Sequence, residues 1–145
     1  MKEPALLQIA MGILFLAAAS DAAESPTYTV IVNPSNPATT SSRIELSRLF
    51  LKKVTAWPAG RAVLPVDQID TSTIRDVFTK DIHKKSIAAI KSFWQQRIFS
   101  GGDVPPPELE SDAEVIAYIR THPGAVGYVA EIPLNAGVKV LKISG

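Results

Sequence analysis

The sequence predicts an α/β protein in which a mostly parallel sheet carries helices on both faces, giving three layers. Short apolar, β-branched runs alternate with longer segments whose apolar residues recur every three or four positions. Helix-sized segments between strands favour parallel pairing, since a parallel pair needs a long crossover connection. Only seven residues separate the last two apolar runs, 125–130 and 138–143. We expect an antiparallel edge there.

The first 22 residues have the pattern of an export signal. Lys2 precedes the apolar run 6–19, and the small residues around Ser20-Asp21-Ala22 fit a small-x-small cleavage site. This run is shorter than the roughly 20 residues that a membrane-spanning helix needs. An uncleaved membrane anchor is the alternative interpretation. We expect a signal peptide at 1–22, one domain at 23–145, and a periplasmic or secreted location.

Composition excludes several classes of site. The chain has no cysteine, so it has no disulfide framework, thiolate metal site or cysteine nucleophile. Neither of its two histidines, His83 and His122, has a partner at metal-ligand spacing, so we expect no metal and no cofactor. Without residues 1–22 the chain carries 14 basic and 12 acidic side chains. That balance does not indicate a nucleic acid or an anionic membrane as partner.

The first half of the domain contains two predicted strands. The run Tyr28–Val32 is β-branched and ends at Asn33-Pro34, after which a polar, proline-containing loop extends to Thr40. Ser42 and Glu45 form a capping-box pattern that opens the first helix. A turn at Trp57–Gly60 then leads into the strand Ala62–Val66.

Three further helices are predicted before the last strands. The polar run Asp70–Thr73 offers N-caps for a helix that continues through Phe78. Ser86 begins a longer helix with apolar residues at spacings of three and four. After the proline run 105–107, Ser111-x-x-Glu114 forms a second capping box, and Pro123-Gly124 ends that helix. We expect the carboxylates around this box, including Asp112, to be exposed.

Residues 45–78 and 123–129 together resemble the phosphate-type periplasmic solute-binding proteins. In that family a helix ending "IF-x-G-K-x-x-x-W-x-x-G" leads into a strand, and a Ser/Thr-rich loop then opens a helix. A late "PGAIGYV" strand returns to the sheet, as Pro123–Val129 does here. The resemblance covers about residues 43–130. It implies one lobe of a type II periplasmic-binding-protein fold, phosphate or a related oxyanion as ligand, and an ABC transporter as partner.

The first candidate site is the loop and helix start that contain Thr71, Ser72, Thr73 and Arg75. Main-chain amides at a helix N-terminus can hold an oxyanion, and hydroxyls or an arginine can add donors. An ordinary capped helix is the alternative interpretation.

The family pattern at this place is "R-x-x-x-S-G-T-R-x-x-F", and the match is incomplete. Ser72 falls on the family serine, but Thr73 falls on its glycine and Ile74 on its threonine. Gln68 stands where the family often has arginine. Asp70 also enters the loop, where its carboxylate would repel a dianion unless it accepts a proton from the phosphate.

Two other segments contribute candidate ligand residues. Ser35, Thr39 and Thr40 lie in the loop after the first strand, and loops at strand carboxyl ends are where this architecture binds ligands. A solvated loop is the alternative for them. Tyr128, in the return strand, offers a hydroxyl to the same cleft, with packing alone as its alternative.

These observations lead to two expectations about function. In the first, the exported lobe binds phosphate or another oxyanion, weakly or in a homodimer that rebuilds the second wall of the site. In the second, it no longer binds a ligand and serves as an interaction module that contacts an envelope protein. The sequence contains no nucleophile elbow and no Gly-rich nucleotide loop, so we expect no enzymatic activity.

Overall fold

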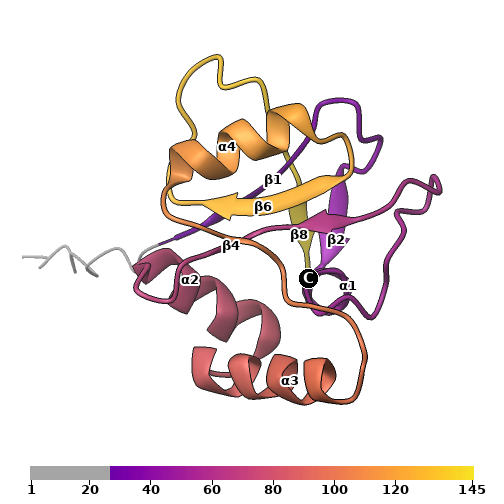
Figure 1. Ribbon diagram of the computed structural model, residues 1–145. Helices are drawn as coiled ribbons and strands as arrows, with labels where there is room; N and C mark the ends of the chain where they lie inside the picture. Colours follow the sequence, from indigo (N-terminus) through magenta and orange to yellow (C-terminus); the bar gives the residue numbers. More distant parts are fainter. Residues whose placement is uncertain (1–26) are drawn as a thin grey trace, which may run out of the picture.

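The computed structural model describes residues 27–145 and shows a central sheet with helices on both faces (Figure 1). The predicted signal peptide at 1–22 lies outside the described residues. Within the described part of the chain, no helix is long and apolar enough to cross a membrane. The predicted α/β fold class with helices on both faces is confirmed.

The sheet strands are short and the helices are of ordinary length. The strands are β1 (Thr29–Val32), β2 (Thr40–Ser42), β3 (Leu64–Pro65), β4 (Asp67–Gln68), β5 (Glu108–Leu109), β6 (Ala125–Val129), β7 (Lys139–Val140) and β8 (Lys142–Ser144). The helices are α1 (Arg43–Phe50), α2 (Thr73–Phe78), the π-helical turn η1 (Thr79–His83), α3 (Ile87–Phe99) and α4 (Asp112–Thr121).

Each α-helix begins after a serine whose hydroxyl accepts the main-chain amide three residues later, as the capping patterns predict. These N-caps are Ser42, Ser72, Ser86 and Ser111. At Ser42 the full capping box is present, because Glu45 also accepts the Ser42 amide. At Ser111 the second bond differs: Glu114 accepts the amide of Glu110, at 2.7 Å.

The four-stranded sheet has the order β3-β6-β1-β7 and is mixed. β3 runs parallel to β6, but β1 is antiparallel to both of its neighbours, β6 and β7. The expectation of a mostly parallel sheet is therefore wrong for this sheet. Helices between strands predict parallel pairing only when consecutive strands become neighbours, and here β6 lies between β1 and β3.

The parallel strands nevertheless share one edge. Only Val66 separates β3 from β4, and its amide donates to the Val126 carbonyl (2.9 Å), so one extended segment runs through both strands. β4 pairs in parallel with β5. β5, β4 and β6 therefore run in one direction, and we call the side on which they end the carboxyl edge. The predicted strand 138–143 is divided: β7 is an antiparallel edge strand beside β1, whereas β8 pairs in parallel with β2.

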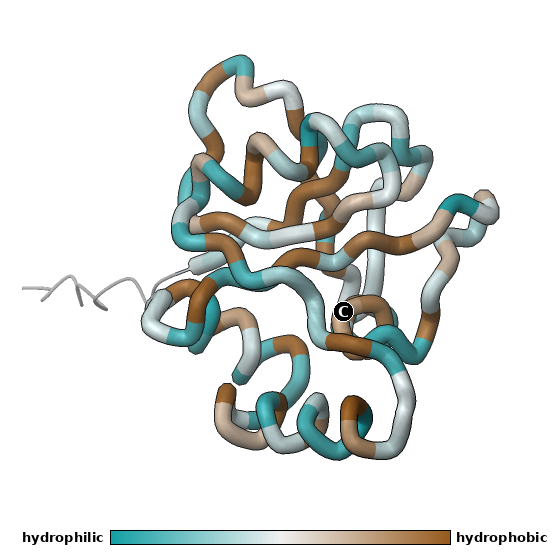
Figure 2. The backbone as a smooth tube through the Cα atoms, viewed as in Figure 1, coloured by the Kyte–Doolittle hydropathy of each residue, from teal (hydrophilic) through white to brown (hydrophobic). Residues whose placement is uncertain are grey.

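Alternate residues of β1 divide the core into two layers. Val30 and Val32 belong to a cluster shared with α1 and α2, and Ile31 belongs to a cluster shared with α4. Figure 2 shows the hydrophobic segments along the central strands between these helices. A third, smaller cluster of Leu51, Ile90 and Trp94 holds α3.

Candidate functional site

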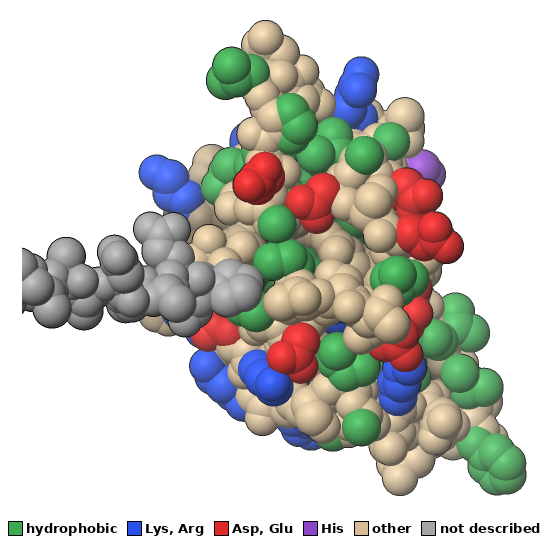
Figure 3. All heavy atoms as spheres, turned by 90° about the vertical axis from the view of Figure 1, so that its left-hand side faces the viewer, with side chains coloured by type: hydrophobic (Ala, Val, Ile, Leu, Met, Phe, Trp, Pro, Cys, Tyr) green, Lys and Arg blue, Asp and Glu red, His purple; other side chains and the backbone are tan. Residues whose placement is uncertain are grey.

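The carboxyl edge brings together the starts of two helices and the end of the central strand. β4 leads into α2, and β5 leads into α4. β1 begins at the same edge, because Thr29 lies opposite Val129. Open α/β sheets bind ligands at the carboxyl ends of their parallel strands. Figure 3 views the molecule from this side and shows acidic and basic side chains lying close together, without one sign dominating.

Ser72 ends the loop after β4 and caps α2. Its Oγ lies 3.3 Å from the Arg75 amide, which it accepts, and donates to Gln68 Oε1 at 2.7 Å. Helix geometry gives the amides of Thr73 and Ile74 no partner within the helix. Those amides are the donors that an oxyanion at the start of α2 would use.

The side chains beside this cap are exposed. Thr71 and Thr73 both lie at the surface, where their hydroxyls are accessible. Asp70 is exposed as well and forms an ion pair with Lys91 of α3. The hydrogen bond from Lys91 lowers the pKa of the Asp70 carboxyl. Lys91 therefore reduces the repulsion that Asp70 exerts on an anion. Because the ammonium group of Lys91 is paired with Asp70, it is not a free positive charge for the anion.

Gln68 links the cap of α2 to the start of α4. While its Oε1 accepts from Ser72, its Nε2 donates to Asp112 Oδ1 at 2.8 Å and to the Tyr128 carbonyl at 3.0 Å. Asp112 Oδ2 accepts the amides of Ala130 (3.0 Å) and Glu131 (3.2 Å) at the end of β6. The expectation that Asp112 is simply exposed is wrong, since three donors converge on its carboxylate.

Arg75 lies in the core instead of at an anion site. Its Nη1 donates to Glu108 Oε1 at 2.7 Å and to the Gln68 carbonyl at 2.9 Å, and its Nε lies 4.0 Å from Asp67 Oδ1. Burial disfavours its charge, but Asp67 and Glu108 outweigh burial and raise the pKa of Arg75. Two carboxylates therefore neutralise the guanidinium and Nη1 is occupied, whereas the buried Nε has no hydrogen-bond partner among residues 27–145.

Tyr128 is fully buried, so its hydroxyl does not reach a cleft. The hydroxyl donates to Asp67 Oδ1 at 2.6 Å and accepts the Gln68 amide at 3.1 Å. Its ring stacks on Phe78 with centroids 3.9 Å apart. Burial raises the pKa of Asp67, against the opposing effects of Arg75 and Tyr128. The packing alternative describes Tyr128, and the ligand-binding interpretation does not.

Ser35, Thr39 and Thr40 lie at the opposite edge of the sheet from Ser72. β1 is antiparallel to β6, so the loop that follows β1 emerges beside the start of β6, where Val32 pairs with Val126. There the Ser35 hydroxyl accepts Arg61 Nη1 at 3.0 Å. The prediction of this loop together with the α2 start as ligand residues is therefore wrong for a single site, because the carboxyl end of β1 lies at the opposite edge.

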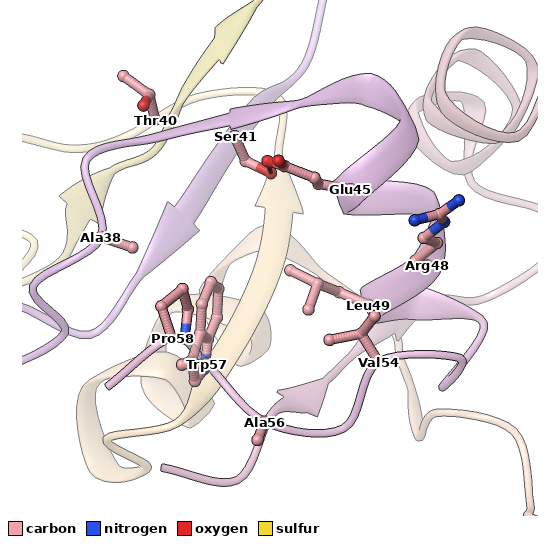
Figure 4. Close-up of a pocket in the computed structure, with 10 residues that line it drawn as sticks. All are labelled: Ala38, Thr40, Ser41, Glu45, Arg48, Leu49, Val54, Ala56, Trp57 and Pro58. Atoms are coloured by element: carbon pink, nitrogen blue, oxygen red, sulfur yellow. Dashed lines mark hydrogen bonds between the residues drawn. The ribbon is translucent and has the colours of Figure 1, made fainter. Parts of the chain in front are cut away.

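That opposite edge contains a cavity of about 270 Å³ (Figure 4). Its walls are largely apolar and include Leu49, Val54, Trp57 and Pro58. The Glu45 carboxylate at its rim is already bonded to Ser41 and Ser42. Ligand pockets combine apolar walls with several convergent polar groups. Thr40, Ser41 and Arg48 also line the cavity, but Ser41 is bonded to Glu45, so we take the carboxyl edge, with its capped helix start, as the stronger candidate.

The sequence interpretation missed the two residues that organise the carboxyl edge, Gln68 and Asp112. In the sequence, Gln68 is only a departure from the family arginine, and Asp112 is only one of several carboxylates after the proline run. Their pairing joins positions 44 apart in the sequence. No local pattern signals it. Among residues 27–145, no cluster of His, Asp and Glu could hold a metal ion.

No protein-family model matches the sequence, and a comparison with curated proteins finds no match. Solved structures do resemble the fold. A candidate phosphate ABC transporter substrate-binding protein with bound phosphate, from Clostridium perfringens, matches with a TM-score of 0.63 and 16% identity. The match covers 80% of this chain and 44% of that one.

Two other solved structures match similarly. An ABC-type phosphate transport receptor from Vibrio cholerae has a TM-score of 0.60 and 18% identity, over 79% of this chain and 44% of its own. PstS from Borrelia burgdorferi has a TM-score of 0.62 and 13% identity, over 81% and 47%. This chain thus spans less than half the length of each structure. Likeness at such identities establishes the fold, and the fold is that of a single periplasmic-binding-protein lobe.

Proposed function

We propose that this chain is an exported, non-enzymatic solute-binding domain that holds phosphate or a related oxyanion at the carboxyl edge. The donors would be the first-turn amides of α2, at Thr73 and Ile74, and the hydroxyls of Thr71 and Thr73, with Ser72 holding the turn as its cap. The observation that carries the proposal is the placement of this capped, exposed helix start beside the ends of β4 and β6. One structure of the same fold has phosphate bound.

The proposed site relies on neutral donors and is open on one side. Arg75 is neutralised by its carboxylate partners, so it adds no free charge to an anion. A single lobe also leaves half of the ligand in water, which limits affinity. We therefore expect a dissociation constant on the order of 1 mM for the isolated chain. Tighter binding would need a second wall from another copy of the chain or from a transporter component in the envelope.

Calorimetry with phosphate, sulfate and molybdate tests the proposal. We expect Ser72→Ala to abolish binding, because it removes the cap that orients the first-turn amides. That change also costs about 0.5–2 kcal/mol of stability as the loss of an N-cap. Ser86→Ala is the matched control: it removes the cap of α3 and leaves the carboxyl edge intact.

Two results would contradict the proposal. One is the absence of heat and of thermal stabilisation with the parent protein at 10-fold the expected dissociation constant, that is, about 10 mM ligand. The other is retention of full affinity by folded Ser72→Ala, since this loop would then not be the site.

A second function, an interaction module without a small ligand, is favoured by the internal pairing at this edge. Ser72 donates to Gln68, and Arg75 binds Glu108, so two predicted ligand donors are already occupied. Leu134, in the loop after β6, is 95% exposed and would suit a protein contact. Purification from envelope extracts should then yield a stoichiometric partner that Leu134→Asp loses and phosphate does not affect.

A further inference from the structure

The carboxylate of Asp112 is surrounded by the type of donors that bind oxyanions. Two main-chain amides at the end of β6, those of Ala130 and Glu131, donate to Oδ2 at 3.0 and 3.2 Å. The side-chain amide of Gln68 donates to Oδ1 at 2.8 Å. Consecutive main-chain amides supplemented by a neutral side-chain donor form a typical anion-binding concavity.

These donors adjoin the proposed ligand site, and although Gln68 is buried, the segment after β6 reaches the surface. Gln68 bonds to Ser72 with one end of its amide and to Asp112 with the other, so one side chain connects the two places. Asp112 is only half-buried, and Glu131 is exposed. An ion that approaches the start of α2 therefore meets the Asp112 carboxylate within the same part of the carboxyl edge.

One donor comes from strand β4 and two come from the segment directly after β6, whereas the acceptor comes from a helix. Gln68 ends β4, and Ala130 and Glu131 follow β6; both strands are fixed in the sheet by backbone pairing. Asp112 is the first residue of α4. After removal of its carboxylate, Gln68 would keep its bonds to the Tyr128 carbonyl and to Ser72, and the amides of Ala130 and Glu131 would remain next to the end of β6.

We infer that Asp112 is a built-in anion that occupies the stronger half of the oxyanion site and competes with the ligand for it. This inference rests on the proposed function and adds its regulation. With Asp112 in place, a phosphate at α2 has only the first-turn amides and nearby hydroxyls, and a fixed negative charge adjoins it. Without the carboxylate, three donors beside that place become free for phosphate and a repulsive charge is lost.

The test is calorimetric titration of the full chain and of Asp112→Ala with inorganic phosphate. We expect the variant to bind phosphate at least 10-fold more tightly than the parent. We also expect formate to raise the unfolding temperature of Asp112→Ala and to leave that of the parent unchanged, because a free carboxylate can refill the vacated place. Equal or weaker phosphate affinity in the folded variant overturns the inference and makes Asp112 a structural tie.

Glu114→Ala is the matched control, since it removes one carboxylate from the same helix. Glu114 accepts only the amide of Glu110, away from the end of β6. Its affinity for phosphate should change less than 2-fold. A gain equal to that of Asp112→Ala would show a general charge effect and would also overturn the inference. If Asp112→Ala does not fold, Asp112→Asn replaces it, with at least a 3-fold gain expected from loss of the charge and no gain counting against the inference.

The two proposals fail separately. Phosphate binding by the parent that Ser72→Ala removes and Asp112→Ala leaves unchanged supports the proposed function and refutes the inference. Binding by Asp112→Ala alone, with none by the parent, supports the inference and refutes a binding role for the natural chain.

Discussion

Arg75 and Tyr128 owe their burial to partners that lie far away in the sequence. The Arg75 guanidinium meets Glu108, 33 residues later, and the Tyr128 hydroxyl meets Asp67, 61 residues earlier. A charge left without its partner in a core costs about 3–5 kcal/mol, so each of these side chains is held by the other groups of the network. Because Arg75 and Tyr128 are bonded to these carboxylates, the donors proposed for a ligand at the carboxyl edge are neutral groups.

A single side chain, His83, also makes the stability of the protein depend on pH. Burial lowers its pKa to about 4, with smaller contributions from Arg75, Lys85 and Lys53. Its Nδ1 lies 2.8 Å from Ser47 Oγ. The unfolded chain, with a histidine pKa of about 6.5, binds a proton that the folded protein does not bind between about pH 6.5 and pH 4. Stability therefore decreases as the pH falls through this window.

We predict a loss of about 2 kcal/mol in the free energy of unfolding between pH 7 and pH 5. Urea unfolding at the two pH values measures it. His83→Gln should abolish most of this dependence, and His122→Gln should retain it. A parent protein equally stable at pH 7 and pH 5 would show that His83 is charged in the folded state.

Contact between β6 and α4 depends on the glycine in the middle of the strand. A Cβ on Gly127 would lie 2.8 Å from Val115 Cγ1 and 2.9 Å from Val66 Cγ2. Both distances are shorter than ordinary van der Waals contact. The return-strand glycine therefore sets how closely the helix that carries Asp112 approaches the sheet.

Gly127→Ala should lower the free energy of unfolding by about 1–3 kcal/mol, as overpacking does. Denaturant unfolding would give the value. Adding Val115→Ala removes the atom that the new methyl group meets, so the double variant should be less destabilised than the sum of the single changes. Strict additivity of the two changes would contradict the close contact.

At the scale of the whole molecule, the two main core layers and α3 differ in how firmly they are held. Trp57 lies in the larger cluster, and its indole Nε1 donates to the Gly124 carbonyl at 2.9 Å, tying the turn before β3 to the start of β6. Trp94 belongs to the small cluster that attaches α3. Elements with few buried contacts open locally at lower free energy than the core.

Trp57→Ala should therefore destabilise the entire protein, by about 3–5 kcal/mol. Trp94→Ala should mainly accelerate amide hydrogen exchange in α3 and lower global stability less. Urea unfolding combined with exchange measurements on both variants compares them. Equal global losses would indicate that α3 is part of the same cooperative unit as the sheet.

Local patterns were sufficient for the helices and for most strand positions. The serine caps at positions 42, 72, 86 and 111 all begin helices, because the hydroxyl-to-amide bond spans only three residues. The resemblance of Pro123–Val129 to a return strand led to the correct fold family. Local patterns could not give the relative direction of the strands, because this depends on which strands pair in the folded sheet.

The sequence by itself determined the α/β class, the capped helices and the polar loop at Ser72, because these depend on contacts within a few residues. Only the tertiary structure decided the rest. An antiparallel β1 separates the Ser35–Thr40 loop from Ser72, and distant carboxylates neutralise Arg75. The Asp112 carboxylate fills donors at the end of β6. The reason is that strand pairing and charge pairing join residues tens of positions apart, and their geometry exists only in the folded chain.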